Sequence, residues 1–457
     1  MQIDESIFKA YDIRGIYPDQ INDKLVEKIG QAFGLFIKDV VKKETPNIVV
    51  GRDGRLSSPA LQKAFIKGVV SVGCNVVDID LVSTDALYFA MGKHEYDGAA
   101  MISASHNPKE YGGIKMLAKA EEAPKPVSGD WGIPEIKKMV IKDEWPESTE
   151  GLIEKKSVME EYIEYCLSIV DTAKFKNFKV VVDTGNGMAV LFLPELKKKL
   201  PIEIVGINTE VDGNFPARGA NPLVGEGFNV IGKAVKEHNG DVGLSFDGDA
   251  DRMFVADENG DIVRPDIILA LVAKALLVKN PGASIVYNLT CSHTVPEVVE
   301  ASGGKAVRSR TGTAYIKDAM INNKAIFGGE VSAHYYFKDN YFADSGLLAF
   351  LILMEVLSES GEKLSEMAKK FDVYAYQVEI NRRVEDRDAV IEAIKEKYAD
   401  GKHDELDGLT VEYEDYWFNL RKSNTEPLIR LVVEAKTEEL KKQKVEELLA
   451  IIGGENE

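Results

Sequence analysis

The stretch Asp241-Val-Gly-Leu-Ser-Phe-Asp-Gly-Asp-Ala-Asp-Arg252 joins a short apolar run to a loop with three carboxylates. The run over 241–246 has the length and composition of a buried strand. Two other stretches have the same form. Gly98-Ala-Ala-Met-Ile102 leads to Ser103-Ala-Ser-His-Asn-Pro108, and Lys324-Ala-Ile-Phe327 leads to Gly328-Gly-Glu-Val-Ser-Ala-His334. Three strands that each end in an unusual loop predict one α/β unit that is used three times.

Two further strands precede each of these loops and support the repeat. The first strands are predicted at 47–51, 179–183 and 284–288, and the second, after a helix, at 75–78, 202–205 and 305–307. Few residues are identical between the copies, so the repeat is one of pattern. In open α/β sheets, ligands bind beyond the carboxyl ends of strands. The three loops are therefore predicted to face one shared cleft.

The segment from residue 372 has a different pattern. It predicts a helix over 386–398, strands over 409–413, 416–420 and 428–435, and a charged helix over 437–452. The short connections between these strands favour an antiparallel sheet with helices on one face. The predicted organisation is three similar α/β domains with mixed sheets, at 1–150, 151–258 and 259–371, and a C-terminal α+β domain at 372–457.

Composition narrows the class of protein. The chain has 457 residues, more than one compact core of about 100–200 residues uses. Its net charge of −19 argues against nucleic-acid and anionic-membrane partners but allows a phosphorylated substrate in a locally basic cleft. Cys74, Cys166 and Cys291 are too few and too scattered for a disulfide framework. With no signal peptide and no apolar run of about 18 residues, a cytoplasmic enzyme is expected.

The loop after 246 has the chemistry of a cation site. Asp247, Asp249 and Asp251 alternate with small residues, so a tight turn can bring the three carboxylates together. Unpaired carboxylates repel one another, and oxygen ligands favour Mg²⁺, Mn²⁺ or Ca²⁺. An EF-hand is rejected because Arg252 stands where that loop needs glycine. A solvated acidic turn is the remaining alternative.

The loop after 102 offers a nucleophile, Ser105, next to His106. No G-x-S-x-G turn surrounds the serine, so a hydrolase triad has little support. Near a metal ion, a serine oxygen can carry a phosphoryl group while the metal offsets the charge of the transition state. Lys115 follows Tyr111-Gly-Gly-Ile114, and it lies either on the surface or in the same cleft.

Three other segments are candidates for substrate contacts. Arg421-Lys-Ser-Asn-Thr425 combines a two-pronged phosphate donor with hydroxyls and an amide, or else is a polar hairpin turn. Glu330 and Ser332 suit sugar hydroxyls, and His334 suits proton transfer unless it only packs beside Tyr335 and Tyr336. Arg14 and the segment 51–55 are equally compatible with the cleft and with solvent or a plain turn.

In this order along the whole chain, the four loops resemble those of the α-D-phosphohexomutase family, especially its phosphomannomutase/phosphoglucomutase branch. The resemblance implies a heart-shaped arrangement of four domains around a central cleft. It implies an intramolecular phosphotransferase that interconverts hexose 1-phosphate and hexose 6-phosphate, of mannose or glucose. The phosphate carrier would be Ser105, which would share one Mg²⁺ with Asp247, Asp249 and Asp251. Hexose 1,6-bisphosphate would be both intermediate and activator.

The resemblance also assigns residues to roles. The catalytic group would be Ser105, His106, Lys115, Arg14 and His334. The substrate-binding group would be Tyr11, Arg252, Thr311, Gly312, Glu330, Ser332, Arg421, Ser423, Asn424 and Thr425. The chain departs from the branch at Thr313, where histidine is common, and at Thr290, where a cation is common. Both departures concern the preferred sugar.

Other functions remain open at this point. A phosphoglucosamine mutase would use the same chemistry on another sugar. The loop Gly329-Glu-Val-Ser-Ala-His334, which is similar to the sugar-binding loop of the mannose/glucose branch, argues mildly against it. A metal-dependent sugar phosphatase would pass the phosphoryl group to water, and a sugar-phosphate binding protein would not react at all. The expected partner is a small phosphosugar, without nucleic acid or membrane, and the expected state is a monomer or homodimer.

Overall fold

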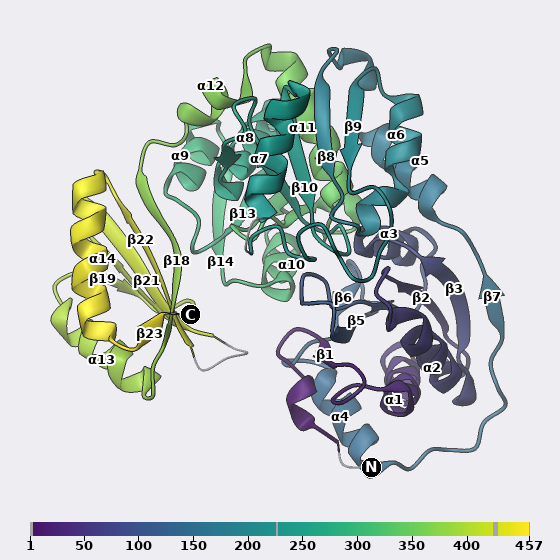
Figure 1. The fold of residues 1–457 in the computed structure, drawn as a ribbon. Coiled ribbons are helices and arrows are strands. Elements are labelled where there is room, and N and C mark those ends of the chain that lie inside the picture. The colour runs from purple at the N-terminus through teal and green to yellow at the C-terminus, as the bar shows by residue number, and fades with distance from the viewer. Residues whose placement is uncertain (1–2, 225–226, 424–427, 457) are drawn as a thin grey trace.

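The structure is a computed structural model, and it describes residues 3–224, 227–423 and 428–456. Within these ranges, four sheets follow one another along the chain, each covered by helices (Figure 1). The first unit contains α1 (Asp23–Val41), α2 (Ser58–Ser71), α3 (Thr84–Lys93), α4 (Ile133–Lys142), β1 (Ile13–Ile16), β2 (Asn47–Arg52), β3 (Asn75–Leu81), β4 (Gly98–Ile102), β5 (Tyr111–Ala118), β6 (Lys125–Pro126) and β7 (Ile153–Lys155).

The next two units have the same kinds of elements. The second contains α5 (Met159–Ile169), α6 (Leu193–Lys199), α7 (Gly227–His238), β8 (Lys179–Asp183), β9 (Glu203–Ile207), β10 (Val242–Phe246), β11 (Met253–Ala256) and β12 (Ile262–Val263). The third contains α8 (Pro265–Lys279), α9 (Thr294–Ala301), α10 (Thr313–Asn322), α11 (Gly346–Ser360), α12 (Leu364–Lys369), β13 (Ser284–Asn288), β14 (Lys305–Ser309), β15 (Phe327–Gly329), β16 (Tyr335–Phe337) and β17 (Ala343–Asp344).

The fourth unit is of a different kind. It contains α13 (Arg387–Lys397), α14 (Glu438–Ile452), β18 (Ala375–Arg383), β19 (Lys402–Asp404), β20 (Leu409–Glu412), β21 (Tyr416–Lys422), β22 (Leu428–Ala435) and β23 (Glu455–Asn456). Its strand pairs are antiparallel, and α13 and α14 lie on one face of the sheet (Figure 1). Thr437 begins α14, because its hydroxyl accepts a hydrogen bond from the backbone N–H of Leu440. The predicted α+β domain is confirmed.

The first three sheets share one topology, which confirms the predicted repeat. Their common strand orders are β3-β2-β4-β5, β9-β8-β10-β11 and β14-β13-β15-β16. In each, three parallel strands are followed by one antiparallel strand. Each unusual loop joins the third parallel strand to that antiparallel strand. The loop over 247–252, for example, is closed by the pair Phe246 and Met253, so both its ends are held by the sheet.

One predicted strand is displaced along the chain. The segment predicted at 324–327 enters the sheet only at Phe327, and the strand then includes Gly328 and Gly329. Glycine is needed at position 329 of this strand, because a Cβ there would lie 2.3 Å from Leu269 Cδ1. Glycine within a strand commonly marks such a close approach.

Two predicted domain boundaries fall before the last strand of a sheet. β7 pairs with β3 beyond residue 150, and β12 pairs with β11 beyond residue 258. These edge strands have three and two residues, too few for a periodic signal in the sequence. The sheets therefore favour boundaries a few residues later than predicted.

The apolar core explains how the loops are held. One continuous core includes Val49, Val182, Phe246 and Phe350, and so spans the first three units. α11 is buried along nearly its whole length at the centre of this core, as an all-round apolar helix should be. The fourth unit has its own core. Among the described residues, no helix is long and apolar enough to cross a membrane.

Candidate active site

The three aspartates after β10 converge as predicted. Ligand oxygens of Asp247, Asp249 and Asp251 all lie within 4.8 Å of one another, and the three residues are buried. The turn that allows this puts Ala250 at φ 64°, a left-handed conformation that non-glycine residues adopt rarely. Asp249 Oδ1 and Asp251 Oδ1 are buried without a hydrogen-bond partner in the described part of the chain. The donor set therefore fits a divalent cation with oxygen ligands.

The charges of this aspartate cage are only partly balanced by the protein. Burial, together with Asp251 and Asp249, raises the pKa of Asp247 to about 8. Burial also opposes ionisation of Asp251, but Lys115 and His334 outweigh it and lower its pKa. Asp247 is therefore ionised only against the repulsion of its neighbours and the effect of burial, and a bound cation would offset both.

The loop 103–108, called the serine loop below, contacts the aspartate cage directly. The Ser105 hydroxyl donates to Asp247 Oδ2 at 3.2 Å, although 142 positions separate the two residues. His106 Nδ1 lies 3.1 Å from Ser105 Oγ, and burial together with Arg252 and Arg14 lowers its pKa. The loops approach so closely that a Cβ at residue 248 would lie 2.8 Å from the Ser105 carbonyl oxygen. Glycine is needed at that position.

Each of the three loops contains one strained residue. Ser105 has φ 50°, Ala250 has φ 64° and Ala333 has φ 66°. Such conformations cost about 1–3 kcal/mol each and persist where the surrounding structure enforces them. All three loops thus contain the same left-handed backbone conformation, which the pattern of the sequence did not reveal.

Arg55 holds the serine loop in place through hydrogen bonds to its backbone. Its guanidinium is buried and donates to the backbone carbonyls of Ser105, Asn107, Pro108 and Tyr111 at 2.6–3.2 Å. Sequence reasoning left the segment 51–55 between a plain turn and a cleft element. The signal that could have found Arg55 is a second arginine three residues after a buried strand, but its carbonyl acceptors lie 50 to 56 positions away.

Arg14 and Lys115 are both mostly buried against the two loops rather than exposed to solvent. Arg14 Nη1 donates to the Ala104 carbonyl at 3.1 Å and to Asn107 Oδ1 at 2.5 Å, so it holds the serine loop. Lys115 Nζ contacts Asp249 Oδ2 at 2.7 Å and Asp251 Oδ2 at 2.5 Å. Burial alone would lower the pKa of Lys115, but these aspartates raise it, so the ammonium stays charged.

Hydrogen bonds fix Glu330 and Ser332 in the loop 330–334, which follows β15 and is the candidate sugar loop. Glu330 Oε1 accepts from the Gly312 N–H at 2.9 Å, and Oε2 accepts from the Tyr336 hydroxyl at 2.7 Å. Burial opposes its ionisation, but His334 and these donors lower its pKa. The Ser332 hydroxyl lies 2.9 Å from His334 Nδ1. The carboxylate is therefore ionised and fixed in orientation.

His334 is held between opposing charges. Arg252 Nε donates to His334 Nε2 at 3.1 Å, a contact that needs an unprotonated Nε2. Burial and Arg252 disfavour the imidazolium, whereas Asp251 and Glu330, at 3.6 and 3.5 Å, favour it and raise the pKa to about 9. The contact with Arg252 and the two carboxylates thus favour opposite forms of the ring, and the raised pKa favours the charged form near neutral pH. Such a group can both accept and release a proton.

The segment 311–313 joins three units. The Tyr11 hydroxyl donates to the Thr311 carbonyl at 3.4 Å, and the Thr311 N–H donates to Asp407 Oδ2 at 3.1 Å. Gly312 has φ 124°, so a glycine is required between them. The Thr313 hydroxyl lies 3.0 Å from the Tyr336 hydroxyl.

At the other departure from the family pattern, the Thr290 hydroxyl accepts from Asn288 Nδ2 at 2.7 Å. Both this position and the one at Thr313 are thus neutral and engaged within the protein. Neither supplies the charge or ring that the resemblance to the family implied for these positions.

The fourth-domain candidates differ from the prediction. Arg421 was predicted in a loop but lies within β21, where it forms an ion pair with Glu379 of β18. Strand pairing continues to Lys422, opposite Ile429. The prediction ended this strand at residue 420, because the polar residues that follow are typical of a turn. The Ser423 hydroxyl accepts from Arg430 at 3.3 Å. Asn424 and Thr425 lie outside the described residues. The recorded ion pair of Arg421 lies within its own sheet and does not join it to the aspartate cage.

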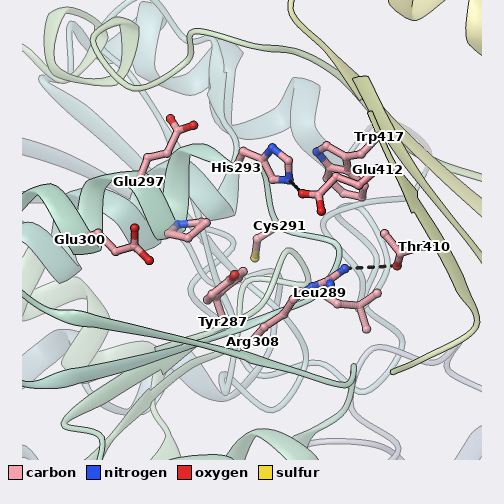
Figure 2. A pocket seen from close by; sticks show the side chains of 11 residues that line it. Tyr287, Leu289, Cys291, His293, Glu297, Glu300, Arg308, Thr410, Glu412 and Trp417 are labelled. Carbon is pink, nitrogen blue, oxygen red and sulfur yellow. Dashed lines mark hydrogen bonds and ion pairs between the residues drawn. The ribbon is translucent and has the colours of Figure 1, made fainter. Parts of the chain in front are cut away.

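A separate pocket of about 260 Å³ lies between the third and fourth units (Figure 2). His293 and Arg308 reach it from the third unit, and Thr410, Glu412 and Trp417 from the fourth. His293 pairs with Glu412 at 3.2 Å, and Arg308 donates to Thr410 at 3.2 Å. The pocket is therefore bordered by polar contacts that hold the fourth unit against the third.

Family models match the chain over most of its length. Models described as phosphoglucomutase/phosphomannomutase alpha/beta/alpha domains I, II and III match residues 5–130, 160–260 and 264–374, and the C-terminal domain of the same group matches residues 379–451.

Individual proteins are similar along the whole chain. A phosphomannomutase of Vibrio cholerae is 40% identical, with 97% of this chain and 98% of the relative covered. One of Methanocaldococcus jannaschii is 39% identical, with 98% of each covered. A solved phosphoglucomutase/phosphomannomutase family protein of Burkholderia thailandensis aligns with a TM-score of 0.89 at 31% identity, covering 100% of both chains. A phosphoglucomutase of Paramecium, at 16% identity and a TM-score of 0.78, covers 98% of this chain and 94% of its own, and shows the fold alone.

Proposed function

Because the chain belongs to the phosphoglucomutase/phosphomannomutase family, we propose that it interconverts hexose 1-phosphate and hexose 6-phosphate, with Ser105 as the phosphate carrier. The observation that carries the proposal is the 3.2 Å contact between Ser105 Oγ and Asp247 Oδ2. It places a nucleophilic oxygen at the edge of a cage suited to a divalent cation. A phosphoryl group on that oxygen would lie within reach of the cation and of the aspartates that hold it.

Asp247, Asp249 and Asp251, with the phosphate on Ser105, would hold one Mg²⁺. When bound, the ion would supply charge stabilisation for the transferring phosphoryl group. Lys115 adds a second positive charge at the cage, at 2.7 Å from Asp249. The buried oxygens of Asp249 and Asp251 that have no partner among the described residues support this assignment.

In the transfer step, the bond between Ser105 Oγ and phosphorus breaks while a bond from phosphorus to a sugar oxygen forms. The sugar hydroxyl loses its proton, and the serine oxygen ends as a hydroxyl, so one proton must move between them. His334, in its neutral form, is the proposed acceptor of the proton from the sugar hydroxyl, and the charged Lys115 is the proposed donor of a proton to the serine oxygen. The lowered pKa of His106 keeps that ring neutral, and its Nδ1 lies within hydrogen-bond distance of Ser105 Oγ.

The product of this step is a hexose 1,6-bisphosphate, which must turn so that its other phosphate faces Ser105. Glu330, held by Gly312 and Tyr336, would bind the sugar hydroxyls in either orientation, and Ser332 would assist. Arg421 and Ser423, with Asn424 and Thr425, would hold the phosphate that is not reacting. Tyr11, Arg252 and Thr311 would line the path between these groups.

The similarity to phosphomannomutases favours mannose phosphates as substrates, with glucose phosphates second. We further propose that the enzyme works in the cytoplasm, as a monomer or homodimer, and is activated by hexose 1,6-bisphosphate. A phosphoglucosamine mutase is the second candidate, because Thr290 and Thr313 leave the sugar side without the charge that the mannose branch commonly has. A phosphatase would need the same cage, but water as the acceptor.

The decisive experiment follows mannose, glucose and glucosamine 1-phosphates by phosphorus NMR with the wild-type enzyme, Ser105→Ala and Ser71→Ala. Ser71 is a matched control, because its hydroxyl donates to the Gly68 carbonyl and accepts from Gln31, both within the same domain. We expect Ser105→Ala to fold and to lose nearly all isomerisation, and Ser71→Ala to keep it. Full turnover by Ser105→Ala would refute the assignment of the carrier. Release of inorganic phosphate without isomerisation would identify a phosphatase instead.

A further inference from the structure

One oxygen of Asp249 is surrounded by donors while the other has none. Oδ2 accepts from the Thr84 hydroxyl at 2.6 Å, from the Ser103 hydroxyl at 3.1 Å and from Lys115 Nζ at 2.7 Å. Oδ1 is buried and has no hydrogen-bond partner in the described ranges. All three donors come from the first unit, whereas Asp249 belongs to the second.

This asymmetry fixes the orientation of the carboxylate. Each carboxylate oxygen offers about two lone-pair sites, so three donors saturate Oδ2. A partial rotation of the carboxylate would break these three contacts, and a half turn, which exchanges two equivalent oxygens, would only restore the same arrangement. Oδ1 is therefore the oxygen that remains free to bind a cation.

Thr84 makes the most specific of these contacts. It is the first residue of α3 and is fully buried. Its backbone N–H donates to the Asp249 carbonyl at 3.0 Å, and its hydroxyl donates to Oδ2 of the same residue. Two bonds from one residue to another set both the backbone and the side chain of Asp249. A β-branched side chain such as threonine has few χ1 choices, so the hydroxyl itself is well placed.

The start of α3 is itself held by the third unit. The carboxylate of the next residue, Asp85, accepts from the Ser345 hydroxyl at 3.1 Å. Ser345 is the N-cap of α11, the buried central helix, and bonds the Leu348 N–H at 2.9 Å. The first turn of α3 thus connects the aspartate cage to the core that all three α/β units share.

We propose that Thr84 is a positioning residue for the cation site, orienting Asp249 so that Oδ1 faces the ion. The inference rests on the proposed function in one respect, namely that the three aspartates bind a divalent cation. Groups that orient metal ligands in this way typically account for about 10–100-fold in metal affinity. No substrate contact is assigned to Thr84.

The test measures Mn²⁺ affinity of the substrate-free protein by the electron paramagnetic resonance signal of the unbound ion. Thr84→Val keeps the shape but removes the hydroxyl, and Thr84→Ser restores it. Thr294→Val is the matched control. Thr294 is a buried first residue of α9, and its hydroxyl donates to the Phe371 carbonyl at 2.8 Å, outside the aspartate cage.

We expect Thr84→Val to weaken Mn²⁺ binding by about 10–100-fold. Thr84→Ser and Thr294→Val should bind within about threefold of the wild type, since each leaves the orienting hydroxyl in place. Thermal unfolding in EDTA must be alike for the compared variants, so that affinity reports orientation. Thr84→Ala, which also lacks the hydroxyl, repeats the test if the valine variant does not fold.

The outcomes separate this inference from the proposed function. A folded Thr84→Val protein with wild-type affinity would overturn the role of Thr84 and leave the cation site intact. Equal losses in Thr84→Val and Thr84→Ser would do the same, because the hydroxyl would then be irrelevant. A wild-type protein that does not bind Mn²⁺ would overturn the cation site itself, and this inference with it.

Discussion

Replacing Arg55 by lysine should loosen the serine loop, although the charge is conserved. The guanidinium donates to Asp53 and to four backbone carbonyls of the segment 105–111. A lysine ammonium has three donors on one nitrogen, so at least two of these acceptors would lose their partner. A buried acceptor without a partner costs about 1–3 kcal/mol. Two such losses predict a local destabilisation of roughly 2–6 kcal/mol.

The effect should appear in both dynamics and activity. Native-state hydrogen exchange over 103–111 reports the free energy of local opening, and steady-state assays report the turnover rate. A displacement of about 1 Å at a reacting group can cost about 100-fold in rate, so a large fall in kcat is expected. Arg52→Lys is the control, because Arg52 pairs with the exposed Asp80 and donates to one backbone carbonyl, two acceptors that the three donors of lysine can serve. The reasoning is refuted if Arg55→Lys and Arg52→Lys behave alike in both measurements.

Two further changes test the sugar loop and a buried charge. Tyr336→Phe removes a donor to the sugar-loop carboxylate, worth about 1.5–3 kcal/mol, and should raise KM more than it lowers kcat. Tyr335→Phe, whose hydroxyl bonds the Pro265 carbonyl, should leave the kinetics unchanged, and equal effects would count against the sugar-loop role. Lys317 Nζ is buried with no hydrogen-bond partner among the described residues, and burial lowers its pKa to about 8. Lys317→Met should therefore be more stable than the wild type by about 3 kcal/mol at pH 7. The gain should shrink as the pH rises from 8 toward 10.5, because the folded lysine then loses the charge that burial disfavours. Urea unfolding across that range checks the sign, and a gain that does not change with pH would contradict the cause.

Much of the fold could be predicted because it is written in local patterns. The strand at 241–246 is apolar and short, and the helix from Thr437 has its cap next to its first turn. The repeat was visible because each copy places a strand of this kind before a loop of unusual composition. The edges of the sheets were not predicted, since β7 and β12 are too short to show a period. The extension of β21 to Lys422 was also missed, because its polar residues are those of a turn.

The sequence by itself determined which chemical groups are present and on which local elements they lie. A serine beside a histidine and three alternating aspartates have their chemistry wherever the chain takes them. Only the tertiary structure decided that Ser105 lies 3.2 Å from Asp247, and that Thr84 and Arg55 hold the two loops in place. Those contacts join residues 50 to 165 positions apart. They arise from the packing of three units on one core, and the spacing of residues along a chain contains no information on which distant donor will meet a buried acceptor.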